Sequence, residues 1–135
     1  MSDPGAADLA ALRLRTPYEP RENVFESFFH SGSLVFAEPE LSRILALLAA
    51  VPTPVCINLE RAAVIPEIAE RAAALVADYG AEDAALLDAA FGRAAPEGRP
   101  PFELPRSMAA VEASRPDVPN DTVDPVFAHG HGLVL

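Results

Sequence analysis

Two stretches of the chain carry apolar side chains at the three- and four-residue spacing of a buried helix face. The first stretch opens at Glu38-Pro39-Glu40 and carries Leu41, Ile44, Leu45 and Leu48. The second stretch covers residues 82–91 and carries Ala85, Leu86, Ala89 and Ala90, followed by Gly92. Proline and carboxylates favour the start of a helix, and glycine favours its end. We therefore expect two amphipathic helices, with a further short helix near residues 66–70.

Apolar runs without polar alternation predict the strands between these helices. Residues 55–59 form a β-branched run of strand length, which is typical of a strand buried on both faces in a parallel sheet. The runs at residues 9–14 and 72–77 are each compatible with a strand or a helical segment, and residues 34–36 with a brief extended piece. Strands that alternate with helices predict a layered α/β/α sandwich with a mostly parallel sheet. We expect it to cover residues 8–135, after an irregular start at residues 1–7 and with an irregular tail at residues 115–135.

Composition narrows the class of protein. The 135 residues suit one domain, half of them are hydrophobic, and the formal net charge is −10, with arginine as the only basic residue besides histidine. Such an acidic surface repels phosphate backbones and anionic lipid, so we expect neither nucleic-acid nor membrane partners. Cys56 has no second cysteine to pair with, and the start of the chain lacks the pattern of a secretory signal, so we expect a cytoplasmic protein.

Several separated motifs, in order along the chain, resemble the C-terminal α/β domain of glycoside hydrolase family 3, the β-glucosidase and β-xylosidase family. They are TPYEPR at residues 16–21, FHSGSL at 29–34, AVIPEI at 63–68, YGAEDAALLDAAFG at 79–92, PEGRPPFELP at 96–105 and DTVDPVFAHGHGL at 121–133. The resemblance implies that the nucleophilic Asp of these enzymes lies on a barrel domain that precedes this one. A barrel of that type needs about 250 residues, so we expect a stand-alone, truncated domain that lacks the barrel and the first strands of its own sheet.

The candidate catalytic residue is Glu19. In this family the C-terminal domain often supplies the acid/base carboxyl from a loop after a strand, and Glu19 follows the run at residues 9–14 in such a place. Glu22 is the alternative acid/base, and solvated loop carboxylates are an equally open interpretation of both. We expect Tyr18, Arg21, Glu22 and His30 to bind substrate, because this segment mixes apolar rings with a few polar groups.

The remaining histidines and the single cysteine do not point to a metal site or a nucleophile. His129 and His131 have no third ligand near them in the sequence, so we expect no metal, and the chain contains no nucleotide or phosphate motif, so we expect no cofactor. Cys56 lies inside an apolar run and is expected to be buried.

The sequence leaves three functions open. The first is a domain that binds a sugar or sugar-like molecule and supplies an acid/base carboxylate, without the nucleophile needed for hydrolysis on its own. The second is a small enzyme of specialised metabolism that performs proton transfer, cyclisation or hydrolysis. The third is a non-catalytic structural or interaction subunit. Absent strands and an absent barrel would leave surfaces uncovered, so we expect a homo-oligomer or a separately encoded barrel partner, besides a small-molecule ligand.

Overall fold

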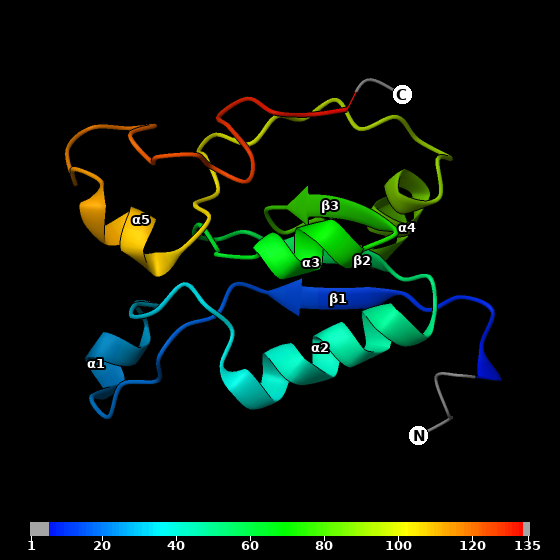
Figure 1. Ribbon diagram of the computed structural model, residues 1–135, viewed down its shortest axis with the longest axis horizontal. Coiled ribbons are helices and arrows are strands. Elements are labelled where there is room, and N and C mark those ends of the chain that lie inside the picture. Colours follow the sequence, from blue (N-terminus) through cyan, green and yellow to red (C-terminus); the bar gives the residue numbers. More distant parts are fainter. Residues whose placement is uncertain (1–5, 134–135) are drawn as a thin grey trace.

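The computed structural model describes residues 6–133, and its centre is a three-stranded parallel sheet in the order β1-β2-β3 (Figure 1). The strands are β1 (Leu12–Arg15), β2 (Pro54–Asn58) and β3 (Ala74–Asp78). Leu14 lies opposite Ile57 in the register of β1 and β2. Both runs that the sequence left ambiguous are therefore strands. The irregular start expected at residues 1–7 lies largely outside the described residues.

The helices cover the sheet in the manner of a layered α/β fold. The helix α2 (Glu38–Ala50) leads from β1 to β2, α3 (Pro66–Arg71) leads from β2 to β3, and the two helices contact each other. The helix α4 (Asp83–Ala90) follows β3 and packs against β3 and β2 on the far side of the sheet in Figure 1. The short helices α1 (Val24–Ser27) and α5 (Met108–Ala113) lie beyond the carboxyl ends of the strands. The predicted fold class is confirmed.

The helix boundaries follow from local sequence. Glu38 opens α2 with proline in its first turn, as predicted, and Ile44 and Leu48 are buried. The helix α4 ends at Ala90, and Gly92 two residues later turns the chain with a φ of +69°, which suits glycine. One detail of the predicted face of α4 is wrong: Ala85 is exposed, and Leu86 is the buried residue. None of the helices in the described part of the chain is long and apolar enough to cross a membrane.

The core lies around β2. Val55 and Ile57 are buried by the helices that cover one face of the sheet, where they join Ile44 of α2 and Ile68 of α3 in one cluster. Each fully buried side chain of this kind contributes about 1.5–3 kcal/mol to folding. Cys56 is also buried, as expected, and burial raises the pKa of its thiol.

After Ala113 the described chain contains no further helix or strand. We call residues 114–133 the returning segment, because they run back along the chain that follows α4 (Figure 1). The Leu104 N–H donates to the Phe127 carbonyl, and the Val126 N–H donates to the Leu104 carbonyl, each over 2.8 Å. A hydrogen-bonded ion pair with Arg115 lowers the pKa of Asp121 to about 2. The two backbone bonds fix the returning segment against the chain that follows α4, and the Arg115–Asp121 pair stabilises the segment internally.

Candidate functional site

The loop that follows β1 holds Glu19 in a defined position. The Glu19 N–H donates to the Ser31 carbonyl over 2.9 Å, in an isolated antiparallel bridge. The Ser33 N–H donates to the Glu19 carboxylate over 3.2 Å. Gly32 has a φ of +85°, and a Cβ built there would lie 2.5 Å from the Glu19 carboxyl carbon. Only glycine therefore allows the Glu19 side chain to fold over this turn.

Contacts of Tyr18, His30 and Glu60 brace this loop. The rings of Tyr18 and His30 are stacked, with centroids 3.9 Å apart and planes 12° apart. The imidazole Nδ1 of His30 contacts the Glu60 carboxylate. Glu60 lies two residues beyond the end of β2, so this contact joins the loop to the sheet. The Arg61 guanidinium adds a second tie, because it donates to the Gly32 carbonyl over 2.7 Å.

Arg21 and Glu22, the other two predicted binding residues, differ in their contacts. Arg21 donates from Nε to the Ser31 hydroxyl over 3.2 Å, which places it at the same turn as Glu19. Glu22 is exposed and has no hydrogen bond or ion pair to any residue in the described range 6–133. The structure therefore brings Tyr18, Glu19, Arg21 and His30 together around the Ser31 turn and leaves Glu22 apart.

A hollow of about 700 Å³ lies between this loop and the carboxyl end of β1. Tyr18 and Glu19 line it, whereas Arg21, Glu22 and His30 do not. Glu40 of α2 contributes a second carboxylate to the lining, and Phe36 contributes an apolar wall. The lining mixes polar and apolar groups in similar proportion, with Arg13, Arg15 and Thr16 among the polar ones. The hollow lies at the carboxyl end of a parallel strand, where open α/β sheets place their ligand sites.

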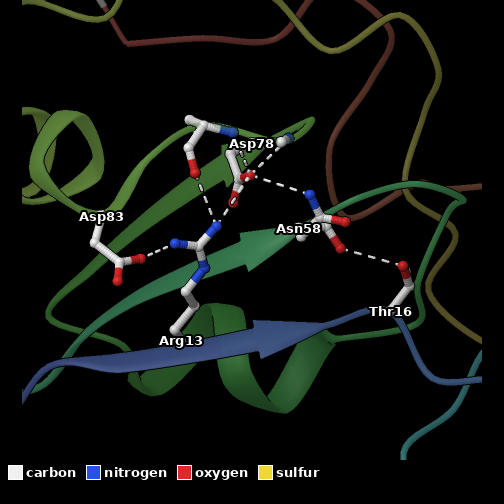
Figure 2. A network of polar contacts seen from close by, with 7 residues as sticks. Arg13, Thr16, Asn58, Asp78 and Asp83 are labelled. Atoms are coloured by element: carbon white, nitrogen blue, oxygen red, sulfur yellow. Dashed lines mark hydrogen bonds and ion pairs between the residues drawn. The ribbon is translucent and has the colours of Figure 1, made fainter.

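A second polar cluster lies at the carboxyl ends of β2 and β3, and Arg13 reaches it from β1 (Figure 2). Asp78, the last residue of β3, is only 4% exposed, and its Oδ1 accepts hydrogen bonds from three donors. These are the Asn58 amide at 3.1 Å, the Gly80 N–H at 2.9 Å and the Ala81 N–H at 3.1 Å. The guanidinium of Arg13 lies 3.8 Å from the same oxygen. The buried carboxylate thus joins β3 to β2 and approaches β1.

The electrostatics of this cluster favour the ionised acid. Burial alone would raise the pKa of Asp78, but the hydrogen bonds from Gly80, Asn58 and Ala81, together with the Arg13 charge, outweigh burial and hold the pKa below its usual value. Arg13 also donates to the Ala81 carbonyl over 2.9 Å and contacts the Asp83 carboxylate, as Figure 2 shows. This cluster therefore fixes the turn from β3 into α4.

Several side chains in these clusters were not predicted from the sequence, among them Arg13, Asn58, Glu60, Arg61 and Asp78. Their position carries the signal that could have found Glu60 and Asp78. Each lies at or just beyond the end of a parallel strand, where open α/β sheets place their ligand sites. The C-terminal histidines lie elsewhere on the returning segment, and the His131 ring is 5.0 Å from the Phe127 ring.

Comparison with known proteins identifies homologues over nearly the whole chain. The chain is 53% identical over 127 residues to β-glucosidase C of Emericella nidulans, a match that covers 94% of this chain and 21% of that protein. It is 52% identical over 133 residues to a probable β-glucosidase C of Aspergillus oryzae, covering 98% of this chain and 21% of that protein. A periplasmic β-glucosidase/β-xylosidase of Dickeya chrysanthemi is 40% identical over 137 aligned residues, again with 98% and 21% covered.

No family model matches the chain. The chain spans about a fifth of the length of the curated relatives it matches. At 40–53% identity over 94–98% of its residues, the chain is a homologue of one segment of these β-glucosidases, in agreement with the predicted resemblance to the β-glucosidase family.

Proposed function

We propose that this chain binds a sugar or sugar-like molecule in the hollow beside Glu19, and that Glu19 acts there as a general acid/base. The observation that carries the proposal is the position of Glu19. Its carboxylate lines the hollow and is held by the Ser33 N–H and the close approach of Gly32. A fixed carboxylate beside a bound glycosidic oxygen is the arrangement that proton transfer requires. The homology to β-glucosidases supports a carbohydrate as the ligand.

The roles of the neighbouring residues follow from their contacts. The Tyr18 ring lines the hollow and is braced by stacking on His30, so it offers an aromatic face to the apolar side of a sugar ring. His30, held by Glu60, and Arg21, held by Ser31, act by fixing the loop. Glu22 has no such contact in the described chain, which favours Glu19 over Glu22 as the acid/base.

We propose further that the chain alone does not hydrolyse glycosides. A retaining glycosidase needs two carboxyl groups about 5 to 5.5 Å apart, one of them a nucleophile. The family resemblance implies a nucleophile on a barrel domain, and a barrel of that type needs about 250 residues, more than the 135 of this sequence. A separately encoded barrel could supply it. The strand β1 has β2 on one side only within the described sheet, so its free edge is a surface for such a partner or for a second copy.

The cytoplasm remains the proposed location, on the grounds of the single buried cysteine. The Dickeya chrysanthemi relative is named as a periplasmic protein. Fractionation of the source cells, with activity-independent detection of the chain by antibody, distinguishes the two compartments.

The test combines binding and turnover. We expect calorimetric titration of the purified chain with D-glucose or D-xylose to show weak, saturable binding that Tyr18→Ala and Glu19→Gln each reduce, because both side chains line the hollow. His131→Ala is the matched control, since it changes a ring on the returning segment. We expect no release of product from aryl β-glucosides. Robust turnover that Glu19→Gln abolishes would show that a second catalytic carboxylate is present, and unaltered binding by the Glu19 and Tyr18 variants would refute the site.

A further inference from the structure

A second, smaller hollow of about 190 Å³ lies near the carboxyl ends of the strands. Its lining includes Asn58, Glu60, Gly80 and Ala81. Two arginines of β1, Arg13 and Arg15, line this smaller hollow and also the larger hollow beside Glu19. Because the two hollows share these side chains, they adjoin, and one ligand can extend from the larger hollow into the smaller one.

The two shared arginines differ in how their charges are balanced. The guanidinium of Arg13 lies 3.8 Å from the buried Asp78 carboxylate and contacts the Asp83 carboxylate (Figure 2). Arg15 is exposed, and its guanidinium makes no ion pair or hydrogen bond with another residue in the described range 6–133. Arg15 therefore presents a positive charge to both hollows that no carboxylate of the described chain balances.

The acidic residues of the two linings limit where a negative group of a ligand can lie. Glu19 and Glu40 line the larger hollow, so a further negative charge is disfavoured beside them. Glu60 lines the smaller hollow, but its carboxylate contacts the His30 Nδ1. The net charge of −10 has little influence here, because charges beyond about 8 Å are largely screened at physiological ionic strength. The Arg15 side of the smaller hollow is thus the best place for a negative group.

We propose that the ligand is a sugar with an anionic group, which binds Arg15 in the smaller hollow while the sugar ring lies beside Glu19. This inference rests on the proposed function, since it concerns the same ligand in the same larger hollow. A planar guanidinium offers paired N–H donors to a carboxylate or to a phosphate. The Asn58 amide adds a donor, because one of its two N–H groups serves Asp78 over 3.1 Å and the other is left for a ligand.

The test compares a neutral sugar with two anionic sugars. Calorimetric titration of the purified chain at physiological ionic strength uses D-glucose, D-glucuronate and D-glucose 6-phosphate. We expect an anionic sugar to bind about 3- to 5-fold more tightly than D-glucose, a modest gain because Arg15 is exposed. A gain with D-glucuronate assigns the anionic group as a carboxylate, and a gain with D-glucose 6-phosphate assigns it as a phosphate. Either gain supports the proposal.

Two variants with the same change of charge show whether Arg15 is responsible. Arg15→Gln removes the charge and keeps a polar side chain, so it should bind the neutral and the anionic sugars with similar affinity. Arg71→Gln is the matched control, because Arg71 is an exposed residue at the end of α3 that lines neither hollow. This control should keep the gain of the unaltered protein, with an identical circular dichroism spectrum.

Three results would overturn the inference, and they separate it from the proposed function. If D-glucose binds and neither anionic sugar binds more tightly, the inference is wrong and sugar binding beside Glu19 stands. If the gain persists in Arg15→Gln, another group binds the anion. If none of the three sugars binds, the proposed function fails together with the inference.

Discussion

Removal of the Asp78 carboxylate should destabilise this protein more than removal of any exposed acid. Asp78→Ala leaves the Asn58 amide and the N–H groups of Gly80 and Ala81 without their acceptor. A hydrogen bond to a charged group contributes about 1.5–3 kcal/mol, but burial of the carboxylate offsets part of that gain. The Arg13 ion pair adds little, because its side chain is 41% exposed and the two atoms are 3.8 Å apart.

These terms together predict that Asp78→Ala lowers the free energy of unfolding by about 2–4 kcal/mol. That is a large part of the roughly 5–15 kcal/mol that stabilises a typical domain. Asp78→Asn keeps one oxygen acceptor for the three N–H donors, but it loses the charge and places an amide NH2 where the buried Oδ2 has no partner in the described chain, so it should cost less than Asp78→Ala without being neutral. The control is Asp88→Asn, which removes a carboxylate 3.4 Å from Arg93 on an exposed helix face and should cost under about 1 kcal/mol.

The measurement is urea unfolding followed by circular dichroism at neutral pH and again at acid pH. The pKa of Asp78 is lower in the folded protein than in the unfolded chain, so its ionisation stabilises the fold at neutral pH. That stability is present above the unfolded pKa of about 3.9 and is lost as the pH falls through the folded pKa. The unaltered protein should therefore lose more stability in acid than Asp78→Asn does; Asp121, whose pKa is also lowered, is common to both proteins.

Two results would refute this reasoning about Asp78. One is an Asp78→Ala variant as stable as the Asp88→Asn control. The other is an Asp78→Asn variant whose stability falls with acid as steeply as that of the unaltered protein. If Asp78→Ala does not fold, Asp78→Asn and Asp88→Asn can still be compared. An Asp78→Asn variant as stable as Asp88→Asn would then refute a stabilising role for the Asp78 carboxylate.

Three further substitutions or treatments test other parts of the structure. Gly32→Ala should lower the free energy of unfolding by about 1–3 kcal/mol in urea titration, because φ is +85° and the new Cβ would collide with the Glu19 side chain; a neutral substitution would contradict this turn. The Cys56 thiol should react with a disulfide reagent far more slowly in the folded protein than in urea, since burial excludes the reagent and raises the pKa of the thiol; equal rates would contradict its burial. Ile57→Ala should cost about 2–5 kcal/mol because the side chain is only 1% exposed, and a calorimetric melting curve close to that of the unaltered protein would contradict this core.

Much of the fold could be predicted from the sequence because local and global preferences agree. The helix from Glu38 and the buried strand at residues 54–58 both have the expected apolar spacing and lengths. Residues 74–78 could not be assigned from their pattern, since a short alanine-rich run suits a helix as well as a strand. Pairing with β2 decides between these two structures, and that pairing joins residues far apart in the chain.

The candidate site was only partly accessible to sequence reasoning, for a similar reason. The proline-flanked loop around Glu19 is local, so its residues could be proposed from their order. The contact of His30 with Glu60 joins residues 30 positions apart, and the pair of Arg13 with Asp78 joins opposite edges of the sheet. Such contacts depend on which strand ends lie side by side, which apolar periodicity does not specify.

The central claim is that the hollow beside Glu19 binds a sugar, and amide chemical shifts test it most directly. The backbone amides of Thr16 and Ser33, which line the hollow, report on binding there. The amide of Gly130 on the returning segment, which does not line the hollow, is the control. Titration of the labelled protein with D-glucose up to about 100 mM detects dissociation constants in the millimolar range. We predict saturable shifts for Thr16, Glu19 and Ser33, and none for Gly130. The absence of shifts with both D-glucose and D-xylose, or shifts confined to the returning segment, would contradict the account.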